Sequence, residues 1–543
     1  MSSKRKASRI LQLSILLPLL LALAYPTTGQ VSEEAVDQQA VARIRGEAFN
    51  HSQIMDIMAT LTDVIGPRLT GSPSLKRAQE FARDKLRDWG IPNARLEAWA
   101  FGRGWSLEGV MANMTAPSFS PLIAYPKAWS PGTNGTVRGE VVYLDAQTPA
   151  DVEKFKGKLH GRVVLFSPAQ LVKPEFTPEG QRATDEELLK LANAEPPPRP
   201  AQSFQLSPEQ RAAAELNYRK WQMVYSEGAA VVLEPGHRDA GTVYVTSAVI
   251  PSPVDMPSEK RVRPWHPSKP AVIPQAVVAA EQYNRMMRLL ARGLAVSAEI
   301  NLQTRFYDDD PMSYNLIGEI PGTDLKAEII MIGSSMDSWH AGTGATDNAS
   351  GAAVALEVMR ILQSLGVKPR RTIRVGLWSG EEQGRLGSRA YVAEHLGRKI
   401  EDSNNPSGRA RWEFQPEYEK VSGYLNLDYG AGRLRGAYLQ GNEAARPIFR
   451  AALAPLKDLG ASTLSISDIG AADHISFDEV GLPGFQFIRD YMEGTTRAPH
   501  TNMDVLDHVM EEDLKQSAAV AASLLWHLAM RGEKLPRTTL PAQ

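Results

Sequence analysis

The chain has 543 residues, of which 43% are hydrophobic and 22% charged, an ordinary globular composition with enough sequence for more than one core. Its 60 basic and 62 acidic residues give a net charge of -2, which argues against nucleic acid or an anionic membrane as the main partner. The absence of cysteine excludes disulfides, thiolate catalysis, cysteine-bound zinc and a lipidated N-terminal cysteine. Any metal must therefore be held by His, Asp and Glu.

The first element in chain order has the pattern of a secretory signal peptide. A basic head is followed by an apolar run from Ile10 to Ala24 that is too short and wrongly flanked for a membrane span. We therefore expect a cleaved signal at residues 1–29, export to the periplasm or the extracellular space, and no stable membrane association. A retained membrane anchor is the alternative, because cleavage is not visible in a sequence.

Residues 33–120 alternate helical patterns with turn signals. The stretches 40–66 and 72–90 have apolar residues at three-and-four spacing, and the second opens on Ser72 and closes at Gly90. From 121 to 292 the pattern changes to short β-branched runs separated by long Pro-rich or polar stretches, which we interpret as surface loops. The β-branched runs are "GTVRGEVVYLD", "GRVVLFSP", "GAAVVLEPG" and "QAVVAAEQ". A second, β-rich module is predicted there.

Strands and helices alternate again over residues 293–535. Strands are expected in "YNLIGEIPG", "EIIMIGSSMD", "TIRVGLWSGEE", "GYLNLDYGAG" and "PGFQFIRD", and helices in "SGAAVALEVMRILQSLG", "SRAYVAEHLG" and "EDLKQSAAVAASLLWHLAM". Strands that are apolar on both faces predict an α/β fold with a mostly parallel mixed sheet flanked by helices. Residues 33–120 and 293–535 would form this discontinuous domain, with 121–292 inserted, and ligands belong at the carboxyl ends of its strands.

Acidic side chains gather at those strand ends. They are Asp347, Glu381, Glu382 and Asp428, and His500 follows a later strand. Carboxylates at one edge of a sheet repel one another unless a cation lies among them, and a divalent metal is the simplest such cation. Neighbouring glutamates point in different directions, so one can bind metal while the other acts as a base toward water. Oxygen ligands with imidazole suit zinc, with manganese or cobalt as substitutes.

Each of these residues also has an ordinary structural alternative. A Glu-Glu pair is typical of a solvated surface, and Asp347 stands where a helix cap is expected. Asp428 could be a turn residue and His500 a surface histidine. The joint pattern favours a metal site, because four acids and a histidine at successive strand ends are improbable by chance.

Five motifs resemble one known family. In chain order they are "MDSWHAGTGATDNASG", "WSGEEQGRLGS", "NLDYG", "DHISF" and "PHTNMD". They look like the co-catalytic dizinc exopeptidases, the family of aminopeptidases and carboxypeptidase Q-like enzymes, and "IGPRLTGSPSLKRAQEFARDKLRDWG" is similar to the opening of the same subgroup. The middle module resembles the protease-associated domain inserted in many members. The resemblance covers nearly the whole mature chain.

The resemblance implies a role for each site residue. Asp347 would bridge two metals, Glu381 would be the general base, and Glu382 and His500 would complete one metal site. Asp428 would complete the other site with a histidine from a G-x-H-x-D-S motif, but this chain has "GSSMDS" there, so Ser335 occupies the ligand position. Asp337, which would orient that histidine, loses its partner. We expect one tight zinc site and a second that is weak or absent.

Two further histidines and an asparagine stand in these motifs. His340 could swing in to replace the missing ligand, line the pocket, or lie on the surface. His474 resembles a residue near the family's substrate pocket, with a hydrogen-bonded loop histidine as the alternative. Asn348 begins a glycosylation sequon, but its place at a helix start beside the metals favours a structural role.

The predicted function is therefore a secreted zinc exopeptidase that cleaves terminal bonds of dipeptides or short peptides, whose activity is placed in doubt by Ser335. The alternatives are a non-catalytic peptide-binding relative that has lost a metal, and a single-zinc acyl-transfer enzyme resembling glutaminyl cyclases. Fold-level analogy suggests a homodimer. The sequence leaves open which end of the peptide is recognised, which side chains are preferred, and what the inserted module does.

Overall fold

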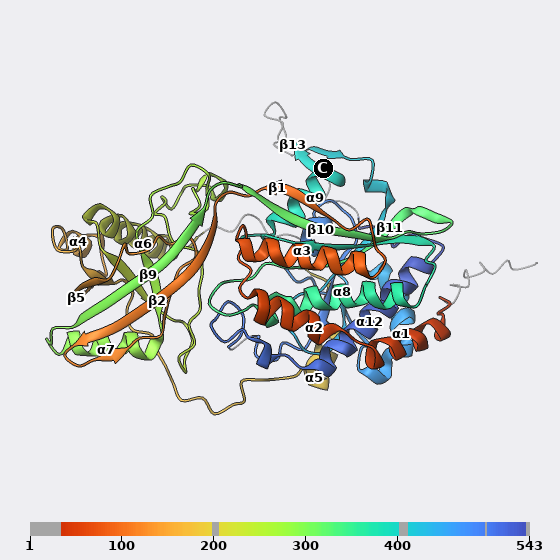
Figure 1. Ribbon diagram of the computed structural model, residues 1–543, viewed down its shortest axis with the longest axis horizontal. Coiled ribbons are helices and arrows are strands. Elements are labelled where there is room, and N and C mark those ends of the chain that lie inside the picture. The colour runs from red at the N-terminus through yellow and green to blue at the C-terminus, as the bar shows by residue number, and fades with distance from the viewer. Residues whose placement is uncertain (1–33, 198–205, 401–410, 495–496, 539–543) are drawn as a thin grey trace, which may run out of the picture. The chain divides into compact units, whose positions relative to one another are not determined.

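Two eight-stranded sheets organise the protein in the computed structural model, which describes residues 34–197, 206–400, 411–494 and 497–538. Both sheets belong to one compact unit, Val36–Gln543 (Figure 1). The signal peptide predicted at 1–29 lies outside the described residues. Within the described ranges, no helix has both the length and the apolar character needed to cross a membrane.

The first sheet has a parallel centre and antiparallel edges. In spatial order its strands are β1 (Arg95–Ala100), β10 (Met312–Ile320), β12 (Arg371–Trp378), β11 (Leu325–Ser335), β15 (Val421–Asn426), β18 (Gly484–Arg489), β16 (Leu434–Tyr438) and β17 (Thr463–Ser465). Strands β12, β11, β15 and β18 are parallel to their neighbours in this central run. Every residue of β12 and β15 is buried, as expected for a sheet covered on both faces. The predicted fold class is confirmed.

Helices cover the two faces because side chains alternate along each strand. Ile330 and Ile332 of β11 pack into a core with α1 (Gln38–Asn50), α2 (Ile54–Ala59), α3 (Pro73–Asp88), α8 (Ser350–Ser364), α10 (Arg446–Leu453) and α12 (Glu511–Met530), several of which are visible in Figure 1. Ile329 and Met331 point the other way, into a core with α9 (Leu386–His395) and α11 (His474–Asp478). Helix α8 begins directly after the loop that carries Asp347.

The second sheet contains all four strands predicted in the middle module. Its order is β3 (Ser120–Pro121), β2 (Gly104–Ala116), β9 (Ser297–Tyr307), β5 (Val137–Tyr143), β6 (Val163–Leu165), β7 (Val231–Pro235), β8 (Gln275–Val278) and β4 (Ala124–Pro126). The long antiparallel strands β2 and β9 belong to this sheet although they lie outside the expected limits of 121–292 (Figure 1). Helices α4 (Pro149–Glu153) and α7 (Ala280–Ala291) also lie in this module.

One long helix of this module has no counterpart in the sequence analysis. Helix α6 (Pro208–Glu227) begins with a capping box between Ser207 and Gln210 and ends at Gly228 in a left-handed conformation. Its polar surface and the Pro-rich stretch before it are typical of a loop, so the sequence analysis did not predict a helix there. A shorter helix, α5 (Asp185–Ala192), precedes it.

Arg68 fastens the N-terminal segment to the loop that follows β11. Its guanidinium is fully buried and donates to five backbone carbonyls: Leu61, Gly66, Met336, Thr343 and Gly344. The backbone of Arg68 also exchanges hydrogen bonds with Ser338, through the Ser338 hydroxyl and amide. Burial lowers the pKa of Arg68 to about 10, so the side chain stays charged. This residue holds the 336–344 loop in place ahead of α8.

Replacing Arg68 by Ala should lower the free energy of unfolding by about 3–4 kcal/mol, because several buried carbonyls lose their donor at once. Urea denaturation of the purified protein measures the change. Arg43→Ala is the matched control, since Arg43 is exposed and donates to one carbonyl, that of Leu365. A loss for Arg68→Ala no larger than for the control would contradict this role.

Candidate metal centre

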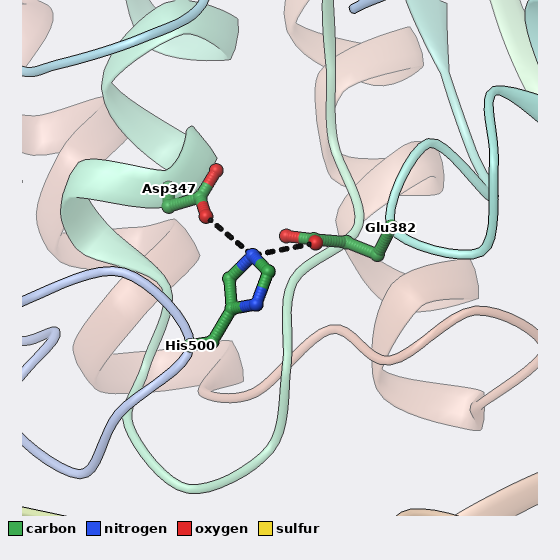
Figure 2. A group of neighbouring side chains, drawn as sticks. All are labelled: Asp347, Glu382 and His500. Atoms are coloured by element: carbon green, nitrogen blue, oxygen red, sulfur yellow. Dashed lines mark ion pairs between the residues drawn. The ribbon is translucent and has the colours of Figure 1, made fainter. Parts of the chain in front are cut away.

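The carboxyl ends of the central parallel strands converge on one group of three side chains. Strand β11 leads through the 336–344 loop to Asp347, β12 leads to Glu382, and the segment after β18 supplies His500. One ligand atom from each lies within 4.8 Å of the others. Figure 2 shows both carboxylates directed at the same ring nitrogen of His500. The sequence analysis placed these three residues together in one site.

The distances in this group suit a small cation. His500 Nε2 lies 3.2 Å from Asp347 Oδ2 and 3.0 Å from Glu382 Oε2. Zinc binds such donors at about 2.0–2.2 Å, so donor atoms of a tetrahedral site are about 3.3–3.5 Å apart. The two spacings between the imidazole nitrogen and the carboxylate oxygens therefore need only a small expansion to match a tetrahedral zinc site.

The electrostatics of the group also favour a cation. Burial, together with the charge of Asp347, raises the pKa of Glu382 to about 7. Burial works to lower the pKa of His500, but Glu382 and Asp347 outweigh it and hold the pKa well above its usual value. Without a metal, the acids thus depend on the protonated imidazole. A divalent ion would replace that proton as the compensating charge.

Aromatic residues fix the orientation of two members of the group. Tyr244, from the inserted module, lies with its hydroxyl 2.9 Å from His500 Nδ1, and its ring stacks on the imidazole. Trp339 donates from Nε1 to Glu382 Oε2 over 2.8 Å. The backbone amide of Val245 donates to the His500 carbonyl as well. The inserted module therefore directs Nε2 of His500 toward the carboxylates, because it occupies the other ring nitrogen.

Two buried aspartates support the backbone that carries these residues. Asp337 accepts from the hydroxyl of Thr70 and from the amides of Glu381 and Glu382, and burial raises its pKa to about 6. It thus organises the Glu-Glu turn rather than a histidine at position 335. Asp504 accepts from the amide and hydroxyl of Thr346 and from the amide of Asp347. The cap at this helix start is therefore Asp504, and Asp347 is left to face His500.

Glu381 and Asp428 line the same cavity as the three-residue group, a space of about 830 Å³. Burial and nearby carboxylates raise the pKa of both well above the usual value, with Asp428 contributing to the shift of Glu381. Asp428 accepts from the amide of Tyr429 and does not belong to the three-residue group. The buried guanidinium of Arg489 offsets part of this rise for Asp428, but burial and the neighbouring carboxylates outweigh it.

Ser335 is buried at the end of β11 and makes a contact that the sequence did not suggest. Its hydroxyl accepts from Asn348 Nδ2 at 3.0 Å, and the same amide donates to Ser334 and to the carbonyl of Leu427. Asn348 is 1% exposed, in keeping with the structural role expected for it. The serine hydroxyl is thus occupied within the protein.

His340 and His474 both lie apart from the metal group. His340 is buried against Trp105, with Nε2 2.7 Å from the Pro126 carbonyl, so it belongs to the contact with the inserted module and is not directed at the metal group. A surface position for His340 is wrong. His474 is buried with Nε2 2.8 Å from the Ile469 carbonyl, in agreement with a hydrogen-bonded loop histidine. Burial lowers the pKa of both to about 4.

Several supporting residues were missed by the sequence analysis. Asp504 was visible as the last residue of "PHTNMD", but its role as a cap depends on a contact over more than 150 residues. Tyr244 stands in "GTVYVTS", which has no feature that distinguishes it from other strand-like runs. Such partners are brought in by tertiary contacts, so local patterns carry no signal for them.

Comparison with known proteins shows what this chain is similar to. Residues 315–525 match the model of peptidase family M28. Carboxypeptidase Q from Bos taurus is 24% identical over 521 residues, covering 94% of this chain and 93% of that protein. Aminopeptidase YwaD from Bacillus subtilis is 28% identical over 233 residues, covering 42% of this chain and 47% of that protein. The predicted resemblance to the zinc exopeptidases is confirmed.

Solved structures share the fold over nearly the whole chain. A peptidase M28 precursor from Shewanella amazonensis is 24% identical and superposes with a TM-score of 0.64, covering 93% of this chain and 99% of its own. BSAP, a zinc aminopeptidase from Bacillus subtilis, is 17% identical with a TM-score of 0.53, covering 92% and 97%. These likenesses establish the α/β architecture.

Substituting Tyr244 by Phe should weaken zinc binding about 10- to 100-fold, because His500 loses the group that fixes its ring. Isothermal titration of the metal-free protein with zinc measures the affinity directly. Tyr218→Phe is the control, since Tyr218 lies on the surface of the same module and accepts from Gln222. Equal affinities for the two variants would show that Tyr244 does not position His500.

Proposed function

We propose that this chain, which carries a peptidase family M28 domain at residues 315–525, is a zinc-dependent exopeptidase acting on short peptides. The observation that supports it best is the three-ligand group of Asp347, Glu382 and His500 in the wall of an 830 Å³ pocket. Three protein ligands with one open position are typical of a catalytic zinc site, whereas structural zinc sites are closed by four. Export through a cleaved signal peptide at 1–29 is part of this proposal.

Zinc bound to this group would supply a Lewis acid that polarises the scissile carbonyl and makes a water molecule more acidic. The protein's own residues do the remaining work. Asp347, Glu382 and His500 hold the ion, and Tyr244 keeps the His500 ring in place. Glu381, adjacent to Glu382, takes the proton from the attacking water and transfers it to the leaving amine. Asp337 fixes the backbone of both glutamates, which sets the position of the base relative to the ligand.

Glu381→Gln should reduce kcat by about 10²- to 10⁴-fold and leave zinc affinity nearly unchanged, since it removes a proton acceptor and no ligand. Turnover of a set of unblocked dipeptides by the zinc-loaded protein measures the first effect, and calorimetric titration measures the second. Glu413→Gln, on the surface strand β14 (Arg411–Phe414), is the matched control. Retention of full activity in Glu381→Gln would eliminate Glu381 as the base.

We further propose that the second metal position of the family is weak or empty in this chain. Ser335 offers a neutral hydroxyl that is already paired with Asn348, and His340 is held by the inserted module. Among the described residues, Asp428 has no hydrogen bond or ion pair with an imidazole. Ser335 is not one of the three ligands of the tight site, so that site has its full ligand set.

Metal analysis by mass spectrometry tests this point. We expect about one zinc per chain in the purified protein and about two after Ser335→His, because the substitution restores an imidazole ligand. Two zinc ions in the unchanged protein would contradict the proposal. One zinc per chain without peptide hydrolysis would favour the two alternative functions, an acyl-transfer enzyme and a binding protein. An assay for cyclisation of peptides with N-terminal glutamine distinguishes them. Turnover indicates an acyl-transfer enzyme, and no turnover indicates a binding protein.

We also propose that the inserted module is a protease-associated domain with a direct part in the site. The contacts of Tyr244 and Val245 with His500 support this role. Its removal would therefore disturb the metal centre.

A further inference from the structure

The pocket that holds the acidic group also contains two arginines. Arg385 and Arg389 line it together with Glu381 and Glu382. The amide of Arg385 donates to the Glu381 carbonyl over 2.9 Å, so its backbone is fixed one turn from the proposed base. Arg385 adopts a left-handed conformation with φ +62°, which is uncommon for a residue with a side chain. The chain thus places a guanidinium beside the reaction site at some conformational cost.

Two carboxylates lie near these arginines, the surface Glu479 and the buried Asp473, which is attracted to Arg385, and neither forms a short hydrogen bond with a guanidinium. Arg385 Nη2 makes a contact of 3.4 Å with Glu479, which is long for a charged hydrogen bond, and Arg389 lies 3.7 Å from the same carboxylate. Arg385 Nη1 is inaccessible to solvent and has no hydrogen-bond partner among the described residues. A guanidinium carries five N–H donors, so this side chain has N–H groups that can bind a further acceptor.

Arg385 precedes α9 as its N-cap residue, Arg389 lies in the first turn, and both guanidinium groups approach the same oxygen of Glu479. The amide of Arg389 donates to the carbonyl of Arg385. Like charges this close repel one another unless an anion lies between or near them. Their shared partner, Glu479, is 45% exposed, so solvent screens its charge. A bound anion would satisfy both arginines.

We propose that Arg385, assisted by Arg389, binds a carboxylate of the peptide substrate on the leaving-group side of the scissile bond. The inference rests on the proposed peptidase function; if the recognised group is the terminal carboxylate, the enzyme is a carboxypeptidase or dipeptidase rather than an aminopeptidase. A peptide's terminal carboxylate lies about one residue, ~3.5 Å, beyond the last peptide bond, so an anchor near Glu381 suits it. Arginine is favoured for this task because its planar fork matches a carboxylate. An acidic side chain presents the same chemistry.

Three substrates distinguish a terminal carboxylate from an acidic side chain as the recognised group. They are Ala-Ala, Ala-Ala-amide, and Ala-Glu-amide, which has a carboxylate only on its side chain. For the substrate with the recognised carboxylate, Arg385→Leu should lower kcat/KM about 10- to 100-fold, with hydrolysis of Ala-Ala-amide unchanged. Arg385→Lys should recover part of the loss, since it keeps the charge without the fork. Arg398→Leu, on the surface strand β13 (Gly397–Ile400), is the matched control.

The outcomes distinguish this proposal from the proposed function. A loss on all three substrates alike would indicate a structural role for Arg385, and no loss on any would remove it from recognition; either result overturns the proposal. If the zinc-loaded wild-type protein hydrolyses none of them, the exopeptidase function fails. Calorimetric titration with the reduced-bond analogues of Ala-Ala and Ala-Ala-amide then tests the anchor. If the carboxylate analogue binds more tightly than the amide analogue, and Arg385→Leu abolishes that difference, the anchor is supported. Equal affinities of the two analogues, or no binding of either, overturn it.

Discussion

The crowding of carboxylates at one edge of the central sheet is the constraint on which the rest of the site depends. Parallel strands end at the same edge, so the acids that follow β11, β12 and β15 are brought together by topology. Burial makes their charges costly, and the raised pKa values of Glu381, Glu382 and Asp428 measure that cost. One imidazole, His500, compensates part of it. The remaining imbalance is the physical reason for a divalent cation there.

This repulsive arrangement is held by segments distant in sequence. The N-terminal region contributes Arg68, which fixes the loop before Asp347, and Thr70, which orients Asp337. The inserted module contributes Tyr244, which fixes His500. None of these residues is among those that line the pocket, yet each restricts the movement by which the acids would otherwise separate. Positioning by neutral or cationic partners outside the group is how a protein keeps ligands in place before the ion arrives.

The sequence was sufficient to predict structural elements where the signal came from neighbouring residues along the chain. Strands β11, β12, β15 and β18 were evident because apolar residues fill both faces. The acids after them were predicted to lie together because the carboxyl ends of parallel strands meet at one edge of the sheet. It was insufficient where contacts are long-range. Helix α6 has a polar surface and follows a Pro-rich stretch, so its periodicity was weak. The pairing of β2 with β9 joins segments almost 200 residues apart, which no local pattern encodes. His340 could not be placed because its partner is a backbone carbonyl, that of Pro126.

Ser335 shows how a buried hydroxyl at the end of β11 is accommodated within the fold. A buried polar group is costly unless it is hydrogen-bonded, and the Asn348 amide meets this requirement by serving Ser334, Ser335 and the Leu427 carbonyl together. These contacts join the ends of β11 and β15. The region is therefore stable with its hydroxyl paired inside the protein. Because Asn348 is the neighbour of Asp347, the same contacts also fix the backbone that directs Asp347 toward His500.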